Sequence, residues 1–191
     1  MEIRLLGRLT IEVDGRRADD ARLGDLGRKA FAYLALERHR PVPRDELAEI
    51  LWGEGLPPTW TAALRGVVSR LRATLAGVGL TDPDVLRSHV GCYQLQLPAD
   101  VVIDLEHVEA LLAAALKEVA DAPQRAQERA AEAASMASRQ FLPGAGGEWV
   151  ERQQASLAAI RVRALELLAE AASAAGDAGT AVAAAEQAIA L

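Results

Sequence analysis

The feature that most constrains the fold is residues 41–75, which read as two helices separated by a proline-interrupted loop. The first helix is predicted to begin near Arg44, and leucine and isoleucine recur on one of its sides. Glycines and prolines in residues 53–58 then break helical geometry. Thr59 is the expected N-cap of the second helix. Two helices joined by so short a connection are typical of a helix-turn-helix, whose second helix reads a nucleic-acid groove.

The second helix has an apolar side and a polar side. The apolar side is predicted to pack against the rest of the fold and comprises Leu64, Val68, Leu71 and Leu75. The opposite side carries small or polar residues, namely Ala62, Ala63, Gly66, Ser69, Arg70 and Ala73. We expect Arg70 to point into solvent, and Arg65 and Arg72 to lie on the flanks, where long side chains reach phosphates or neighbouring carboxylates. The alternative is that these arginines form only the solvated side of a structural helix.

The segments around this pair predict a sheet, a helix and a hairpin. Residues 2–17 alternate apolar and polar side chains around an Asp14-Gly15 turn, so they indicate a small antiparallel sheet. Residues 26–38 have helical spacing, with Arg28 and Lys29 on the polar side. Residues 85–97 return to alternation and predict a hairpin directly after the second helix of the pair. Such a hairpin is a wing, and its Arg87, Ser88 and His89 are expected to enter a neighbouring groove.

Charge and cysteine content limit the function classes. The formal net charge is -6, but residues 1–100 hold 14 Lys+Arg and 14 Asp+Glu, whereas residues 101–191 hold 7 and 13. A neutral N-terminal half can still present a basic face. The single cysteine excludes an intramolecular disulfide, and three scattered histidines give no zinc spacing, so we expect a reduced, cytoplasmic compartment. The apolar runs are too short for a membrane span, which predicts a soluble protein without a membrane partner.

The C-terminal half is rich in alanine and predicts stacked antiparallel helices. Helical spacing covers residues 104–120, 123–140 and 148–175, and a last helix begins near Ala178. Asp104 is a candidate cap, Pro123 suits a first helical turn, and Gly176 can end the third helix. Residues 143–147 are rich in glycine but lack the lysine of a phosphate-binding loop, so they are interpreted as a connector.

Three segments resemble a known family: RDELAEILWGE (residues 44–54), ALRGVVSRLRATL (63–75) and GCYQLQL (91–97). They are similar to the SARP family of antibiotic-pathway activators, and residues 1–97 resemble an OmpR/PhoB-type winged helix. Residues 141–191 resemble the tetratricopeptide-like bacterial transcriptional activation domain. The expected fold is therefore mainly α with a small β component. We expect a winged helix-turn-helix domain in residues 1–98 and an all-α helical array in residues 102–191, which the resemblance leads us to regard as truncated at its C-terminus.

The resemblance implies a transcriptional activator without enzymatic activity. Its partners would be double-stranded promoter DNA, RNA polymerase and a second copy of the protein on direct repeats. The predicted DNA-binding residues are Thr59, Thr61, Arg65, Ser69, Arg70, Arg72, Arg87 and His89. The loop between the two helices contacts RNA polymerase in OmpR/PhoB proteins, which here implies Glu54, Leu56 and Trp60. No catalytic, metal-binding or cofactor-binding residue is predicted.

The second helix departs from the family in ways that leave an alternative open. Thr61, Ala62 and Ala63 are small where SARP sequences often carry basic or amide side chains, and Gly66 lowers helix propensity by roughly 1 kcal/mol relative to alanine. In the wing, Gln94 replaces a common arginine. The alternative function is an interaction adaptor whose winged helix no longer reads DNA.

Overall fold

The computed structural model describes residues 1–18 and 20–191, which are mainly helical with a small β component, as predicted. The chain divides into two compact units. The first comprises Met1–Val102 and Leu142–Arg152, and the second comprises Ile103–Phe141 and Gln153–Leu191. The sequence assigned residues 142–152 to the second domain, whereas in the structure they belong to the first unit.

The first unit opens with a sheet of strand order β3-β2-β1-β7, in which the β1–β2 and β2–β3 pairs are antiparallel. Its strands are β1 (Glu2–Arg4), β2 (Thr10–Val13), β3 (Arg16–Arg17) and β7 (Val102–Ile103). The predicted turn between β2 and β3 is present, because Val13 pairs with Arg16 across it. Asp14 and Gly15 both have positive φ, 48° and 77°, as a tight type I′ hairpin requires.

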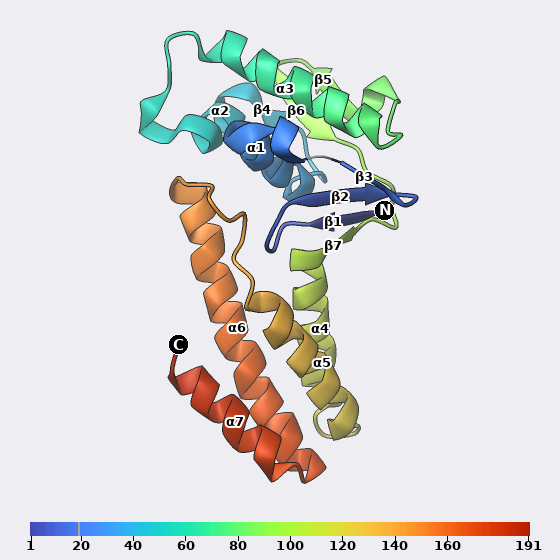
Figure 1. The fold of residues 1–191 in the computed structure, drawn as a ribbon, viewed down its shortest axis with the longest axis vertical. Helices are drawn as coiled ribbons and strands as arrows, with labels where there is room; N and C mark the ends of the chain where they lie inside the picture. Colours follow the sequence, from blue (N-terminus) through green and yellow to red (C-terminus); the bar gives the residue numbers. More distant parts are fainter. Residues whose placement is uncertain (19) are drawn as a thin grey trace. The chain divides into compact units, whose positions relative to one another are not determined.

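Three helices and a second sheet complete this unit (Figure 1). The helices are α1 (Gly24–Leu36), α2 (Arg44–Trp52) and α3 (Trp60–Gly77), with short 3-10 helices at Asp20–Arg22, Gly53–Gly55 and Pro83–Val85. The second sheet has the order β4-β6-β5, formed by Val42–Pro43, Cys92–Leu95 and Leu86–His89. Strands β5 and β6 are the predicted hairpin, so the unit is a winged helix-turn-helix.

Helix α3 buries the side that its spacing predicted. Its buried residues are Leu64, Val67, Val68, Leu71 and Leu75. Thr59 occupies the N-cap position, but its side chain makes no capping hydrogen bond, which corrects the expected role of that hydroxyl. The backbone closes the turn instead, because the Trp60 amide donates to the Pro57 carbonyl at 2.9 Å.

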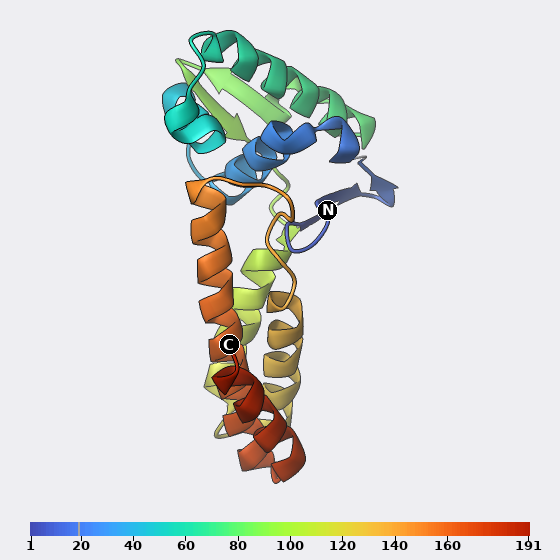
Figure 2. The same cartoon turned by 60° about the vertical axis from the view of Figure 1, so that its left-hand side comes forward.

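The second unit is built from long helices (Figures 1 and 2). These helices are α4 (Asp104–Glu118), α5 (Pro123–Ala137), α6 (Glu148–Ala175), whose first turn belongs to the first unit, and α7 (Ala178–Ile189). One buried cluster joins all four helices and comprises Ala115, Ala126, Ala130, Leu167, Leu168, Ala171 and Ala184. Small side chains at these positions allow close approach of neighbouring helices.

The ends of these helices follow the predicted signals in part. Pro123 is the first residue of α5, and Gly176 ends α6 with a φ of 81°. Asp104 is the first residue of α4 rather than its N-cap, and its carboxylate accepts from the Leu105 amide. Asp177 caps α7 by accepting from the Thr180 amide at 3.1 Å. Among the helices described by the structure, none combines the length and apolarity needed to cross a membrane.

Candidate nucleic-acid interface

Helix α3 presents a polar surface on the side away from its buried stripe. Arg65, Ser69 and Arg70 are exposed along this surface, and Thr59 and Thr61 are exposed at its N-terminal end. The stripe packs against the fold because its leucines and valines recur with helical spacing, and this fixes the opposite side toward solvent. The structure therefore places five of the predicted DNA-binding residues on one helix face and its leading edge.

Gly66 lies in the middle of this face. A Cβ atom added there would lie 3.7 Å from Nη1 of Arg70, which is ordinary van der Waals contact. No positive φ requires glycine at this position, and the neighbouring Ala62 is exposed. Positions 62 and 66 therefore carry no long side chain, whereas Arg65, Ser69 and Arg70 are exposed beside them.

Arg72 is exposed on α3 and also contacts the wing. Its Nη2 and Nε atoms donate to the Leu86 carbonyl oxygen at 2.9 and 3.3 Å. Leu86 begins β5, so the guanidinium ties α3 to the base of the hairpin. A planar guanidinium suits this task because two of its N–H groups point the same way. The sequence placed Arg72 on a flank but gave no sign of its partner.

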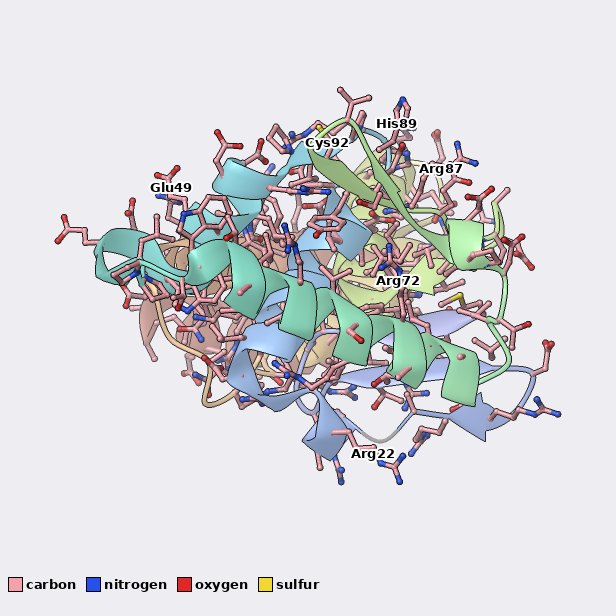
Figure 3. All side chains as sticks on the ribbon, turned by 90° about the horizontal axis from the view of Figure 1, so that it is seen from above. Arg22, Glu49, Arg72, Arg87, His89 and Cys92 are labelled. Atoms are coloured by element: carbon pink, nitrogen blue, oxygen red, sulfur yellow. The ribbon has the colours of Figure 1, made fainter. Side chains whose placement is uncertain are left out.

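The wing carries Arg87 and His89 on its first strand and turns at Val90 and Gly91 (Figure 3). Val90 is 82% exposed and adopts a φ of 45°, which is unusual for a β-branched residue. Arg87 forms an ion pair with Asp84 at 3.1 Å, and both side chains remain largely exposed. His89 is exposed near the tip.

Two further contacts fix the wing against the helices. Gln94 Nε2 donates to the Arg38 carbonyl at 3.0 Å, so the residue that replaces the common arginine holds β6 to the end of the α1 region. Arg44 donates to the Ser88 hydroxyl at 3.2 Å, and its guanidinium lies 5.4 Å from the centre of the Tyr93 ring. The orientation of the hairpin is thereby set from two sides.

The three residues predicted to contact RNA polymerase line a single hollow of about 680 Å³. Glu54 and Leu56 are exposed in the α2–α3 loop, and Trp60 is half-buried at the start of α3. The hollow also includes residues that the sequence did not associate with this loop, among them Lys29, Glu49, Glu148, Trp149 and Arg152. The hollow is thus lined both by the α2–α3 loop and by four residues between 147 and 152, whereas the sequence predicted a contact surface in the loop alone.

Lys29 is the residue that sequence reasoning missed most clearly. It was placed on the polar side of its helix, but it is only 6% exposed. Its Nζ donates to the carbonyl oxygens of Leu51 and Gly146 at 2.9 and 3.1 Å. Arg28 donates to the Pro143 carbonyl at 3.1 Å, and the Leu142 amide donates to the Leu5 carbonyl at 3.0 Å. These bonds make residues 142–147 an ordered part of the first unit.

A charged network lies behind the hollow. Tyr33 packs edge-on against Trp149, with ring centres 5.2 Å apart, and its hydroxyl donates to Glu46 at 2.5 Å. Burial and the Glu46 carboxylate raise the pKa of Tyr33 to about 12. Arg40 donates to both Glu46 oxygens and to Glu37. The Arg40 hydrogen bonds lower the pKa of Glu46, and the Glu46 and Glu37 carboxylates raise the pKa of Arg40.

In the part of the chain that the structure describes, no group of three or more histidine, cysteine or acidic side chains is arranged to hold a metal ion. Cys92 is partly buried on β6, and its thiol lies 3.8 Å from the Val90 carbonyl.

The chain is similar to transcriptional regulators, although no protein-family model matches it. The regulatory protein AfsR of Streptomyces coelicolor is 32% identical over 140 residues, which are 73% of this chain and 14% of AfsR. The transcriptional regulatory protein EmbR of Mycobacterium tuberculosis is 33% identical over 98 residues, which are 51% of this chain and 25% of EmbR. The chain thus spans less than two thirds of the length of these curated relatives.

A solved structure extends the similarity over almost the whole chain. The structure of Mycobacterium tuberculosis EmbR in complex with a low-affinity phosphopeptide matches with a TM-score of 0.85 and 28% sequence identity. The match covers 97% of this chain and 49% of that chain. With the winged helix and the helical segment both present, these similarities place the chain in the SARP family of transcriptional regulators.

Proposed function

We propose that this transcriptional regulator is an activator that binds promoter DNA through its winged helix. In this proposal α3 enters the major groove, the β5–β6 wing contacts the adjacent minor groove, and the α2–α3 loop contacts RNA polymerase. The observation that carries the proposal is the exposed face of α3, on which Arg65, Ser69 and Arg70 follow one another on a helix whose other side is fully buried. Arginine is the commonest reader of guanine and also binds phosphates.

The roles of the predicted residues differ in this proposal. Arg70 and Ser69 lie at the centre of the face and are assigned to base edges, whereas Arg65 and Thr59 are assigned to phosphates. Thr61 is assigned to the leading edge of the helix. Arg87 and His89 contact the backbone beside the wing. Arg72 acts by holding the wing in place through Leu86 rather than by reaching the DNA itself.

The domain assignment follows from the same proposal. The winged helix of the first unit is the DNA-binding domain, and the helices of the second unit correspond to the activation domain. A second copy of the protein on a direct repeat would add affinity, because the small residues of α3 limit what one copy can read.

Binding to promoter fragments over a range of salt concentrations tests the DNA-binding part. The wild-type chain should bind at low salt and weaken steeply as salt rises, because each phosphate contact releases counterions. Arg70→Ala should cost about 1 to 3 kcal/mol and relax sequence preference, whereas Arg65→Ala should reduce the salt slope by about one contact. A wild-type protein that fails to bind duplex DNA even at low salt would rule out the activator.

Transcription from the same promoter tests the polymerase contact. Leu56 is 45% exposed, so Leu56→Ala should keep the fold and DNA binding but reduce activation. Trp60→Ala removes a larger side chain from the same hollow and should have the same effect. Leu116→Ala is a matched control, because Leu116 is an exposed leucine of α4 in the second unit. Activation that stays at the wild-type level in both loop variants would remove the loop from the proposal.

The adaptor remains the second candidate because Ala62 is exposed and Gly66 has no side chain on the face that should read DNA. An adaptor would show no salt-dependent binding to duplex DNA. The low-salt measurement on the wild-type chain therefore separates the two functions directly.

A further inference from the structure

The first unit has a second basic surface, on the opposite side of α3 from the wing. In Figure 3, α3 crosses the view with Arg87 and His89 on one side and Arg22 on the other. A hollow of about 420 Å³ lies there, lined by Arg17, Ala18, Arg22, Arg70, Ala73, Thr74 and Gly77. It joins the last turns of α3 to β3 and to the short helix Asp20–Arg22. Strand β3 and the short helix both lie outside the helix-turn-helix and the wing.

From this arrangement we infer that Arg17 and Arg22 form a phosphate-binding site for the DNA strand that borders the major groove opposite the wing. The inference rests on the proposed function and extends it, because it adds the N-terminal sheet to the DNA-contacting surface. Phosphate contacts of this kind fix the register and orientation of a protein on the duplex without reading its sequence.

The charge of the hollow favours an anion. Arg17, Arg22 and Arg70 each carry a full positive charge, and Arg16 adds another nearby, because its Nη1 would lie 3.3 Å from a Cβ atom placed on Gly79. Glu12 pairs with Arg17 at 3.1 Å and offsets one charge. The C-terminal end of α3 contributes only about half a negative charge. Asp20 of the neighbouring short helix is paired with Arg8 at 2.7 Å. Among the described residues that line the hollow, three are arginines and none is acidic.

The shape of the hollow fits a backbone phosphate. Ala73 and Gly77 leave space on the α3 side, and Ala18 leaves space on the sheet side. Arg17 and Arg22 are exposed, so a ligand can reach both side chains from solvent. Arg17 is 60% exposed even though it is paired with Glu12.

Groove geometry explains why the site lies where it does. The major groove of B-DNA is about 12 Å wide, so a helix seated in it has a phosphate backbone on each side. The wing lies beside one of these backbones. Arg70 belongs both to the exposed face of α3 and to the hollow. When α3 reads bases through its exposed face, the hollow therefore lies beside the phosphate backbone on the side of the groove opposite the wing.

The test is the salt dependence of binding by the full chain to a fluorescent duplex of mixed sequence. Arg17→Gln/Arg22→Gln should make the slope of log K against log salt shallower, by the amount expected for the loss of about two phosphate contacts. Arg17→Lys/Arg22→Lys keeps both charges and should retain the wild-type slope. Arg125→Gln/Arg163→Gln removes the same charge from exposed positions of the second unit, 66% and 60% exposed, and should leave the slope unchanged.

A second variant tests the site without removing an arginine. Ala18→Glu places a carboxylate in the hollow and should weaken binding by about tenfold, while the tryptophan emission spectrum stays that of the wild type. If wild-type protein binds DNA and both Arg17→Gln/Arg22→Gln and Ala18→Glu bind as it does, the site is wrong and the proposed function stands. If wild-type protein does not bind duplex DNA, the proposed function fails and this inference fails with it.

Discussion

The buried ammonium group of Lys29 donates a hydrogen bond to the carbonyl oxygen of Gly146, 117 residues further along the chain, at 3.1 Å. The same nitrogen donates to Leu51 in α2 at 2.9 Å. One side chain on α1 thus holds the helix that leads into the α2–α3 loop and the segment that leads into α6. Because these elements line the same hollow, Lys29 sets the shape of the surface proposed to meet RNA polymerase.

Lys29→Met should destabilise the first unit by about 2 to 3 kcal/mol, because it removes the donor to two carbonyl oxygens while keeping most of the side-chain volume. Urea unfolding followed by tryptophan fluorescence measures this, since Trp52, Trp60 and Trp149 all belong to the first unit. Lys117→Met, at an exposed position of α4, is the control and should unfold as the wild type does. Equal midpoints for the two variants would show that the Lys29 bonds contribute nothing.

Arg72→Ala should loosen the wing without unfolding the winged helix, because it removes the two hydrogen bonds to the Leu86 carbonyl. Faster hydrogen exchange at the β5 and β6 amides is the expected result. Arg65→Ala is the matched control on the same helix, because Arg65 is exposed and lies outside this contact. Unchanged exchange in the Arg72 variant would mean that the two bonds to the Leu86 carbonyl do not hold the hairpin in place.

Gly66→Ala should stabilise α3 by about 0.5 to 1 kcal/mol, because alanine has the higher helix propensity and the added Cβ meets nothing closer than 3.7 Å. The midpoint of urea unfolding, read by tryptophan fluorescence, reports this gain. A lower midpoint would reveal crowding on the face of α3. DNA affinity measured on the same variant reports whether the bare backbone at this position is needed for close approach to a groove.

Acid should weaken the first unit through Glu46. The Arg40 hydrogen bonds lower its pKa in the folded protein, so its contribution to stability is present above the unfolded pKa and is lost as pH falls through the folded pKa. Urea unfolding between about pH 7 and about pH 3 should therefore show a smaller loss of stability for Glu46→Gln than for the wild type. Parallel losses in the two proteins would contradict this linkage.

Ala130→Leu should destabilise the second unit by about 1 to 3 kcal/mol, because Ala130 is fully buried where α4, α5, α6 and α7 meet and a larger side chain overfills that space. Thermal unfolding followed by circular dichroism measures the change. Ala131→Leu, at the next and exposed position of α5, should leave the transition nearly unchanged. Similar effects of the two substitutions would argue against tight packing at Ala130.

Local patterns in the sequence determined much of this fold. The spacing of Leu64, Val68 and Leu71 fixed which side of α3 is buried, because a helix repeats every 3.6 residues wherever it packs. The Asp14-Gly15 turn and the position of Pro123 were equally readable, since both depend on backbone geometry within a few residues. The exposure of Arg70, Arg87 and His89 followed from the same periodicities.

Only the tertiary structure decided what the long polar side chains do. Lys29 and Arg72 bond to backbone carbonyl oxygens of Gly146 and Leu86, and the sequence carries no mark of such an acceptor because every residue has one. For the same reason residues 143–147 read as a connector, although hydrogen bonds tie this segment to the first unit. Arg28 of α1 donates to the Pro143 carbonyl, and the adjacent Leu142 amide donates to the Leu5 carbonyl. Sequence periodicity determines which face of an element is apolar, whereas the contacts of its charged residues depend on which distant backbone folding brings within reach.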